Sequence, residues 1–139
     1  MPRPDYYGNP AGLTEDIDVV RAIYAAFAAR DIGGMLRHLA ADCELDLRGT
    51  AALIGRRQPY RGHDGIREYL ADVERTWEEL ELHAEDFRAI PGSVIVMGRV
   101  QGRRAGERVE RRAVWTWKVS EGRATHVRVA DLGSPPAAA

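Results

Sequence analysis

The chain has 139 residues, 45% of them hydrophobic, which is enough for one hydrophobic core and too little for two. Its 20 lysines and arginines balance 21 acidic residues, so there is no net positive charge to attract nucleic acid or an anionic membrane. Cys43 is the single cysteine, which excludes an intramolecular disulfide and a thiolate zinc cluster. No segment is apolar enough for a membrane span or a signal peptide, so we expect a cytoplasmic protein with no nucleic-acid or membrane partner.

The first part of the chain predicts two helices after an N-terminal arm. Residues 1–13, rich in proline and glycine, form the expected arm. Thr14 can cap a helix whose apolar residues recur at the spacing of one buried face. These residues are Ile17, Val20, Tyr24 and Phe27. After a break at Arg30, Asp31 can cap a second, shorter helix around Met35.

A strand and the clearest helical pattern follow. Residues Cys43 to Leu47 alternate as a strand does, and a loop containing glycine and proline runs to Gly62. From Asp64 onward, a third helix has an apolar side and a charged side that includes Asp72. The apolar side consists of Ile66, Tyr69, Leu70, Val73, Trp77 and Leu80.

Beyond this helix the hydrophobic period changes to two, which predicts strands. The strands cover residues 82–90, 94–102, 109–119 and 124–131, and the short turns between them indicate an antiparallel meander. The predicted fold is α+β, with three N-terminal helices against one face of a curved, mainly antiparallel sheet. We expect one domain over residues 14–132 and a disordered tail over residues 133–139.

Four stretches resemble the SnoaL-like branch of the nuclear transport factor 2 fold superfamily, which includes ketosteroid isomerase, limonene epoxide hydrolase and polyketide cyclases. They are AARDIGGMLRHLAADCELDLRG, YRGHDGIREYL, AVWTWKVSEGR and HVRVAD. The resemblance implies a cone: a strongly bent sheet whose concave face, covered by the helices, encloses an apolar pocket. It indicates fold better than chemistry, because this fold carries enzymes, ligand binders and subunits without catalysis.

The two tryptophans of the predicted third long strand share one face, because alternate residues of a strand point the same way. If the resemblance holds, Trp115 and Trp117 line the pocket and offer flat apolar surface to a ligand. The alternatives are that they pack as core beneath the helices or lie in a dimer interface. Tyr60 is expected at the pocket mouth. Further expected ligand contacts are Tyr69, Phe27, Met97 and Arg99.

A carboxylate on the predicted first strand is the main candidate for catalysis. Glu44 and Asp46 share one face of this strand. If that face looks into the cone, a desolvated carboxylate has a raised pKa and can transfer protons near neutral pH. If it faces solvent, no function follows. The general base of ketosteroid isomerase aligns approximately with Asp46, so the resemblance implies Asp46 as the proton acceptor.

Two further residues are candidates to stabilise developing charge. The helix tyrosine of the isomerase falls at Ile23 or Tyr24, so Tyr24 can supply a hydroxyl, although a tyrosine on a buried helix face is more often packing. His126 can titrate near neutral pH, and its alternative is a solvated strand face. Where the isomerase has a second oxyanion-binding acid, this chain has Trp115. No histidine or carboxylate spacing suggests a metal, and no cofactor motif is present.

Two functions remain open from the sequence. The first is a cofactor-independent isomerase, cyclase, dehydratase or epoxide hydrolase that acts on an apolar or polycyclic substrate by general acid/base catalysis. The second is a non-catalytic ligand-binding or dimerisation module of the same fold. A buried, titrating carboxylate in the cavity favours the first, and a sealed or carboxylate-free cavity favours the second. A homodimer is expected in both cases, because both faces of the strands carry apolar residues.

Overall fold

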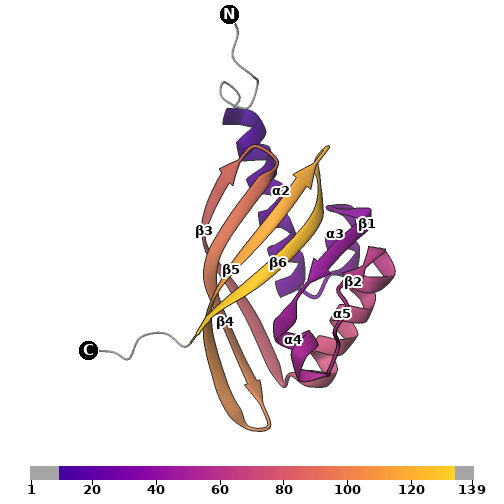
Figure 1. Ribbon diagram of the computed structural model, residues 1–139, viewed down its shortest axis with the longest axis vertical. Helices are drawn as coiled ribbons and strands as arrows, with labels where there is room; N and C mark the ends of the chain where they lie inside the picture. The colour runs from indigo at the N-terminus through magenta and orange to yellow at the C-terminus, as the bar shows by residue number, and fades with distance from the viewer. Residues whose placement is uncertain (1–9, 134–139) are drawn as a thin grey trace, which may run out of the picture.

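The structure is a computed structural model that describes residues 10–133. Four helices and six strands follow one another along this part of the chain (Figure 1). The helices are α2 (Pro10–Ala28), α3 (Ile32–Arg37), α4 (Arg48–Leu53) and α5 (Gly62–Thr76). The strands are β1 (Leu39–Asp46), β2 (Tyr60–Arg61), β3 (Glu79–Ile90), β4 (Ser93–Arg104), β5 (Glu107–Ser120) and β6 (Arg123–Gly133). Residues 1–9 of the expected arm and 134–139 of the expected tail lie outside the described residues.

The strands form one six-stranded sheet in the order β2-β1-β6-β5-β4-β3. The four long strands make the predicted antiparallel meander, whereas β1 runs parallel to β6 and closes the sheet with the short β2. Trp115 lies opposite Val96 on β4 and Val129 on β6, so these three residues share one face. The sheet is therefore mixed but mostly antiparallel.

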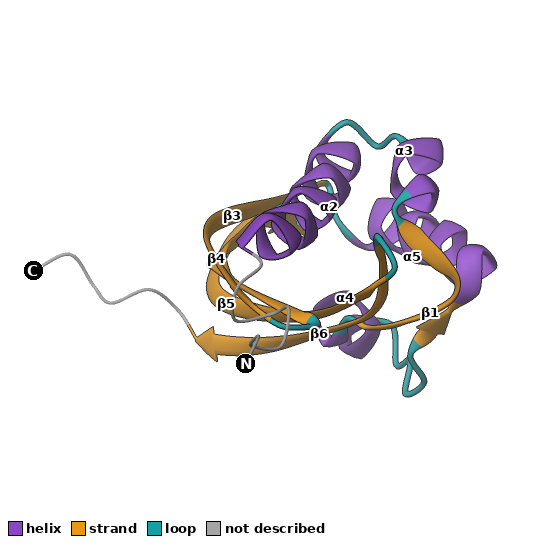
Figure 2. Ribbon diagram, turned by 90° about the horizontal axis from the view of Figure 1, so that it is seen from above, coloured by secondary structure: helices purple, strands orange, loops and turns teal. Residues whose placement is uncertain are grey.

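The helices cover the concave face of the curved sheet, as Figure 2 shows from above. Helix α2 packs against β3 and β4, α5 packs against β1 and β2, and α4 contacts β6 and α5. The predicted α+β fold, with helices on the concave face of a bent sheet, is confirmed. Within the described residues, no helix is both long and apolar enough to cross a membrane.

The break between α2 and α3 lies where it was predicted. Arg30 has a positive φ of 53°, and its guanidinium donates to the backbone oxygens of Phe27 and Leu80, which ties the end of α2 to β3. The Asp31 carboxylate then accepts a hydrogen bond of 3.0 Å from the backbone N–H of Gly34 and caps α3. Local chemistry thus determines this turn.

Three local predictions differ from the structure. Helix α2 begins at Pro10, before Thr14, because proline fits the first turn of a helix. The predicted loop between Leu47 and Gly62 contains α4 and β2, which are too short to show a hydrophobic period. Asp72, predicted on the solvent side of α5, is 2% exposed because Tyr60 lies over it and donates to its carboxylate.

Candidate functional site

The tryptophan face of β5 looks toward helix α2. Trp115 and Trp117 are 2% and 4% exposed. Nε1 of Trp117 donates to the Tyr24 hydroxyl at 3.1 Å, and the Tyr24 ring meets the two indoles edge-on at centroid distances of 5.5 and 5.7 Å. Both tryptophans therefore pack as core against α2, which was one of the alternatives left open by the sequence.

The cavity that remains inside the cone is small. Its volume is about 30 Å³, close to that of one water molecule. Tyr24, Phe27, Tyr69 and the two tryptophans line it, together with aliphatic side chains and without any carboxylate. Burial raises the pKa of Tyr24 well above its usual range, although the indole N–H donation lowers it slightly, so this hydroxyl stays neutral at physiological pH. As packed here, the cone interior cannot hold a polycyclic molecule.

Tyr60 lies deep in the core and not at a pocket mouth. It is fully buried, and its hydroxyl donates to Oδ2 of Asp72 at 2.9 Å. Arg75 contacts the other oxygen of this carboxylate, and the guanidinium of Arg56 lies 4.0 Å from the centroid of the Tyr60 ring. This polar cluster fastens β2 and the preceding loop to α5. Its role is therefore structural.

The candidate catalytic acids lie on the outer face of the sheet. In the parallel pairing of β1 and β6, Glu44 is opposite His126 and Asp46 is opposite Arg128, whereas Leu45 and its partner Val127 face the core. Nε of Arg48 is 3.1 Å from Oδ1 of Asp46, whose side chain is 34% exposed. The condition for proton transfer by Asp46, that its face looks into the cone, is not met. The structure brings Asp46 near His126 but separates both from Tyr24 and the tryptophans.

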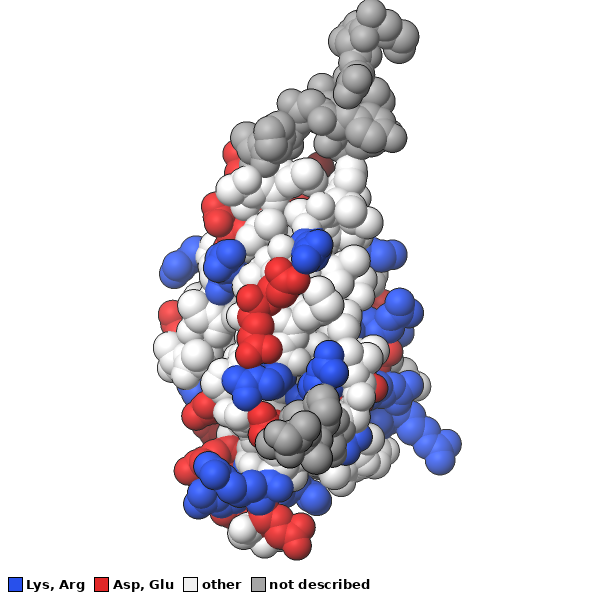
Figure 3. Space-filling model, turned by 90° about the vertical axis from the view of Figure 1, so that its left-hand side faces the viewer, with Lys and Arg blue, Asp and Glu red and all other residues white. Residues whose placement is uncertain are grey.

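Met97 and Arg99 also lie on the outer face. Met97 is 38% exposed, and Arg99 donates to Glu85 at 3.0 Å and to Glu110 at 2.9 Å. Figure 3 shows that acidic and basic side chains are interspersed over one side of the molecule, with uncharged surface between them. Alternating arginines and glutamates of this kind are typical of a solvated strand face.

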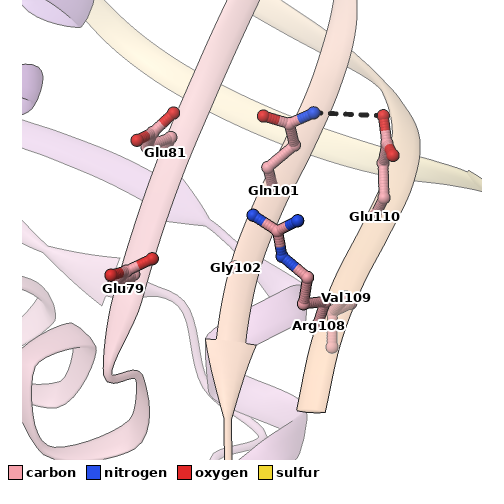
Figure 4. Close-up of a pocket in the computed structure, with 7 residues that line it drawn as sticks. All are labelled: Glu79, Glu81, Gln101, Gly102, Arg108, Val109 and Glu110. Carbon is pink, nitrogen blue, oxygen red and sulfur yellow. Dashed lines mark hydrogen bonds between the residues drawn. The ribbon is translucent and has the colours of Figure 1, made fainter. Parts of the chain in front are cut away.

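A polar hollow occupies the outer face where β3, β4 and β5 run side by side (Figure 4). Its volume is about 190 Å³. Glu79 and Glu81 lie on β3, and Gln101 on β4 donates to Glu110 on β5 at 3.1 Å. The lining is largely charged, and Gln101 bonds to Glu110 across two strands, which is typical of a solvated sheet face. We do not assign it a ligand.

A larger cavity with a mainly apolar lining lies on the concave face, between α4 and strands β4, β5 and β6. We call it the α4 groove, and its volume is about 490 Å³, within the range of small-molecule sites. Its apolar lining comprises Ala52, Leu53, Trp77, Val100, Val109, Ala113 and Val129. Its polar lining consists of Arg48, Arg104, Arg111, Arg112 and Asp131, with Gly49 beside them.

Trp77 forms part of the floor of the α4 groove and is held from two sides. Its Nε1 donates to the buried hydroxyl of Thr50 on α4 at 3.1 Å. Its ring lies against Gly102 on β4, where a Cβ would come within 2.7 Å of the indole carbons. A side chain at position 102 would therefore displace the indole, and the glycine lets it lie flat against the strand.

Asp131 is the one carboxylate that lines the α4 groove. Nη2 of Arg111 lies 3.0 Å from Oδ2 of Asp131, and the backbone N–H of Gly133 donates to Oδ1 at 2.6 Å. Partial burial acts to raise the pKa of Asp131, but these donors outweigh it and lower the pKa overall. Asp131 is therefore ionised at neutral pH and is a weak proton acceptor. Within residues 10–133, no group of three or more potential ligands could hold a metal ion.

The sequence interpretation missed the α4 groove. Trp77 was assigned to the apolar side of a helix, and the arginine pairs at positions 103–104 and 111–112 were not considered as part of a site. Strand alternation sends Arg103 to the outer face and leaves Arg104 at the groove. The signal that could have identified the groove is an arginine alternating with Val109 and Ala113 on one strand face.

The fold and the groove define a cone-shaped α+β protein of the nuclear transport factor 2-like class. The SnoaL-like domain family matches residues 20–127. An uncharacterized protein of Mycobacterium tuberculosis is 31% identical over 125 residues, which cover 88% of this chain and 92% of that protein. The chain belongs to the SnoaL-like domain family, and the resemblance noted in the sequence is confirmed.

Solved structures show the same fold. TerC, co-crystallized with polyporic acid, has a TM-score of 0.76 and 28% identity, with 84% of this chain and 91% of that chain covered. A nuclear transport factor 2-like protein of unknown function from Burkholderia pseudomallei has a TM-score of 0.77 and 24% identity, with 84% and 90% covered. TerC thus provides a similar chain in complex with a small organic molecule.

Proposed function

We propose that this protein binds a small, largely apolar organic molecule in the α4 groove. The observation that carries the proposal is the groove itself: about 490 Å³ with an aromatic and aliphatic floor, against about 30 Å³ inside the cone. The co-crystal of TerC with polyporic acid supports a small-molecule ligand for a chain of this kind.

Binding without acid/base catalysis is the function that the geometry supports best. The cavity inside the cone is lined by no carboxylate, and Asp46 and His126 lie on the opposite face of the sheet. The one carboxylate at the α4 groove, Asp131, is held ionised by Arg111 and so accepts a proton poorly. The ligand-binding alternative from the sequence is therefore preferred to the isomerase-like enzyme.

Two-dimensional NMR of the three tryptophan indole N–H groups tests where a ligand binds. The probes are 2-naphthoate and its neutral analogue 2-naphthamide. We expect at least one probe to shift the Trp77 signal, assigned with Trp77→Phe, while the signals of buried Trp115 and Trp117 move little. Shifts confined to Trp115 and Trp117 would place the ligand in the cone, and no shift with either probe at millimolar concentration would contradict the proposal.

A matched pair of substitutions locates the site on α4. Leu53 and Ile54 are neighbours with 41% and 44% exposure, but only Leu53 lines the groove. Leu53→Ser is expected to weaken probe binding about threefold to tenfold, because loss of one leucine contact costs on the order of 1 kcal/mol. Ile54→Ser should leave the affinity unchanged. Equal effects of the two substitutions would exclude the α4 groove as the binding site.

A further inference from the structure

The polar lining of the α4 groove is strongly unbalanced in charge. Four arginines line it against one carboxylate, Asp131, so the sum of formal charges is +3. This imbalance is local, since the whole chain carries a formal net charge of −1. The excess positive charge thus lies around an apolar cavity.

Two of the four arginines already have carboxylate partners. Arg48 lies 3.1 Å from Asp46, which is outside the groove, and Arg111 pairs with Asp131. Arg104 and Arg112 have no carboxylate within 4.0 Å among residues 10–133. Arg104 lies at the end of β4 on the same strand face as Gly102, against which the Trp77 ring lies, whereas Arg112 pairs with Arg99 and its side chain points to the outer face. Arg104 is therefore the group in the groove that is available to an incoming anion.

The groove therefore combines two kinds of surface that one ligand can use together. Trp77, Val109 and Val129 offer an apolar floor for a flat body. Guanidinium groups offer a fork of N–H donors that matches the oxygens of an organic acid. An inorganic anion would leave the floor uncovered, and a neutral apolar molecule would leave the guanidinium groups unused.

We propose that the ligand of the α4 groove is an organic anion, with a flat apolar body on Trp77 and an ionised oxygen acid, carboxylate or acidic hydroxyl, held by Arg104. This inference rests on the proposed function, because it names the chemical class of the ligand for the same groove. No covalent step is involved. Arg48 and Arg111 add to the positive potential while they remain paired.

The test compares the affinities of 2-naphthoate and 2-naphthamide for the same protein by calorimetry. They share one ring system and differ in charge. We expect 2-naphthoate to bind at least about tenfold more tightly, the size of one charge-assisted hydrogen bond. Raising the salt concentration should weaken binding of the anion and leave that of the amide unchanged.

Substitution of two adjacent arginines provides a test and its matched control. Arg104→Gln is expected to remove most of the preference for 2-naphthoate, whereas Arg103→Gln, with the same change of charge on the outer face, should retain it. Arg104 is exposed at the end of β4, so its substitution should leave the fold intact, which thermal unfolding verifies. The Trp77 signal should report binding in both variants.

The outcomes separate this inference from the proposed function. Equal affinity for the two probes, with a shift of the Trp77 signal, would contradict an anionic ligand. The proposal that the α4 groove binds small molecules would then stand. An equal loss of preference in the Arg103 and Arg104 variants would also contradict the anionic ligand, because the effect would then be general attraction. Binding of neither probe would overturn both proposals.

Discussion

At the scale of single residues, the core depends on tyrosine hydroxyls that are buried with partners. Tyr24 accepts from the indole of Trp117, and Tyr60 donates to the carboxylate of Asp72. Burial raises the pKa of Tyr24, Tyr60 and Tyr69, and donation to Asp72 raises that of Tyr60 further. Each hydroxyl is thus neutral in the fold, and each phenolate is disfavoured there.

The burial of these neutral hydroxyls predicts that the fold loses stability at alkaline pH. Unfolded tyrosines ionise near pH 10, whereas these three ionise higher in the fold, so the unfolded state releases its protons first. The free energy of unfolding should not depend on these groups below about pH 10 and should fall steadily above it. The difference in phenolate absorbance between wild type and Tyr24→Phe reports the ionisation of Tyr24 alone. We expect no ionisation of Tyr24 before far-ultraviolet circular dichroism is lost, and its ionisation in the intact fold would contradict the prediction.

At the scale of secondary structure, the backbone of β3 leaves no room for a side chain at Gly98 of β4. The register shifts between Ala84 and Asp86, where β3 carries a bulge. A Cβ built on Gly98 of β4 would lie 1.8 Å from the carbonyl oxygen of His83 and 3.3 Å from Cα of Ala84. Glycine at position 98 therefore permits the bulge that helps to bend the sheet around α2.

Adding a methyl group at position 98 tests whether this close contact requires glycine. Gly98→Ala should lower the free energy of unfolding by more than about 3 kcal/mol, because backbone atoms and not flexible side chains oppose the new Cβ. Gly49→Ala is the control, since nothing lies within 4 Å of its Cβ. In helix α4 this control should be neutral or stabilising by up to about 1 kcal/mol. Urea unfolding measures both, and small effects in both variants would show that the bulge adjusts.

At the scale of the whole molecule, the outer face of the sheet carries an apolar strip between charged regions. Met97 pairs with Val114 across β4 and β5, and Ile95 and Ile90 lie on the same face. Met97 and Ile90 are 38% and 53% exposed. Since α2 to α5 cover the opposite face, we propose that a second copy of the chain covers this strip.

A charge placed in the strip tests the homodimer. Met97→Asp should give a monomer whose melting temperature is near that of wild type measured at low concentration. Ile32→Asp on α3 is the control, with the same exposed fraction of 38%, and should leave the dimer intact. Light scattering and sedimentation measure the mass. A monomer mass for the unchanged chain across micromolar concentrations would refute the proposal.

Much of the fold could be predicted from the sequence because its signals are local. The period of two predicted β3 to β6, and the spacing from Ile66 to Val73 predicted α5. The site could not be predicted in this way. The sequence left open whether the Asp46 face looks into the cone or toward solvent. Pairing with β6 turns this face outward, and that pairing joins segments about 80 residues apart. The contribution of Trp77 and Arg104 to one groove is equally non-local.

The sequence by itself determined helices α2, α3 and α5 and the meander, because alternation, spacing and capping act between residues a few positions apart. Four stretches of the sequence also indicated the SnoaL-like class. Tertiary structure alone decided which strand face is inside, that Trp115 and Trp117 fill the cone, and that space for a ligand remains beside α4. Those outcomes depend on the register of β1 against β6 and on how far side chains fill a shared volume. Both quantities are set by packing between distant segments, which no local pattern encodes.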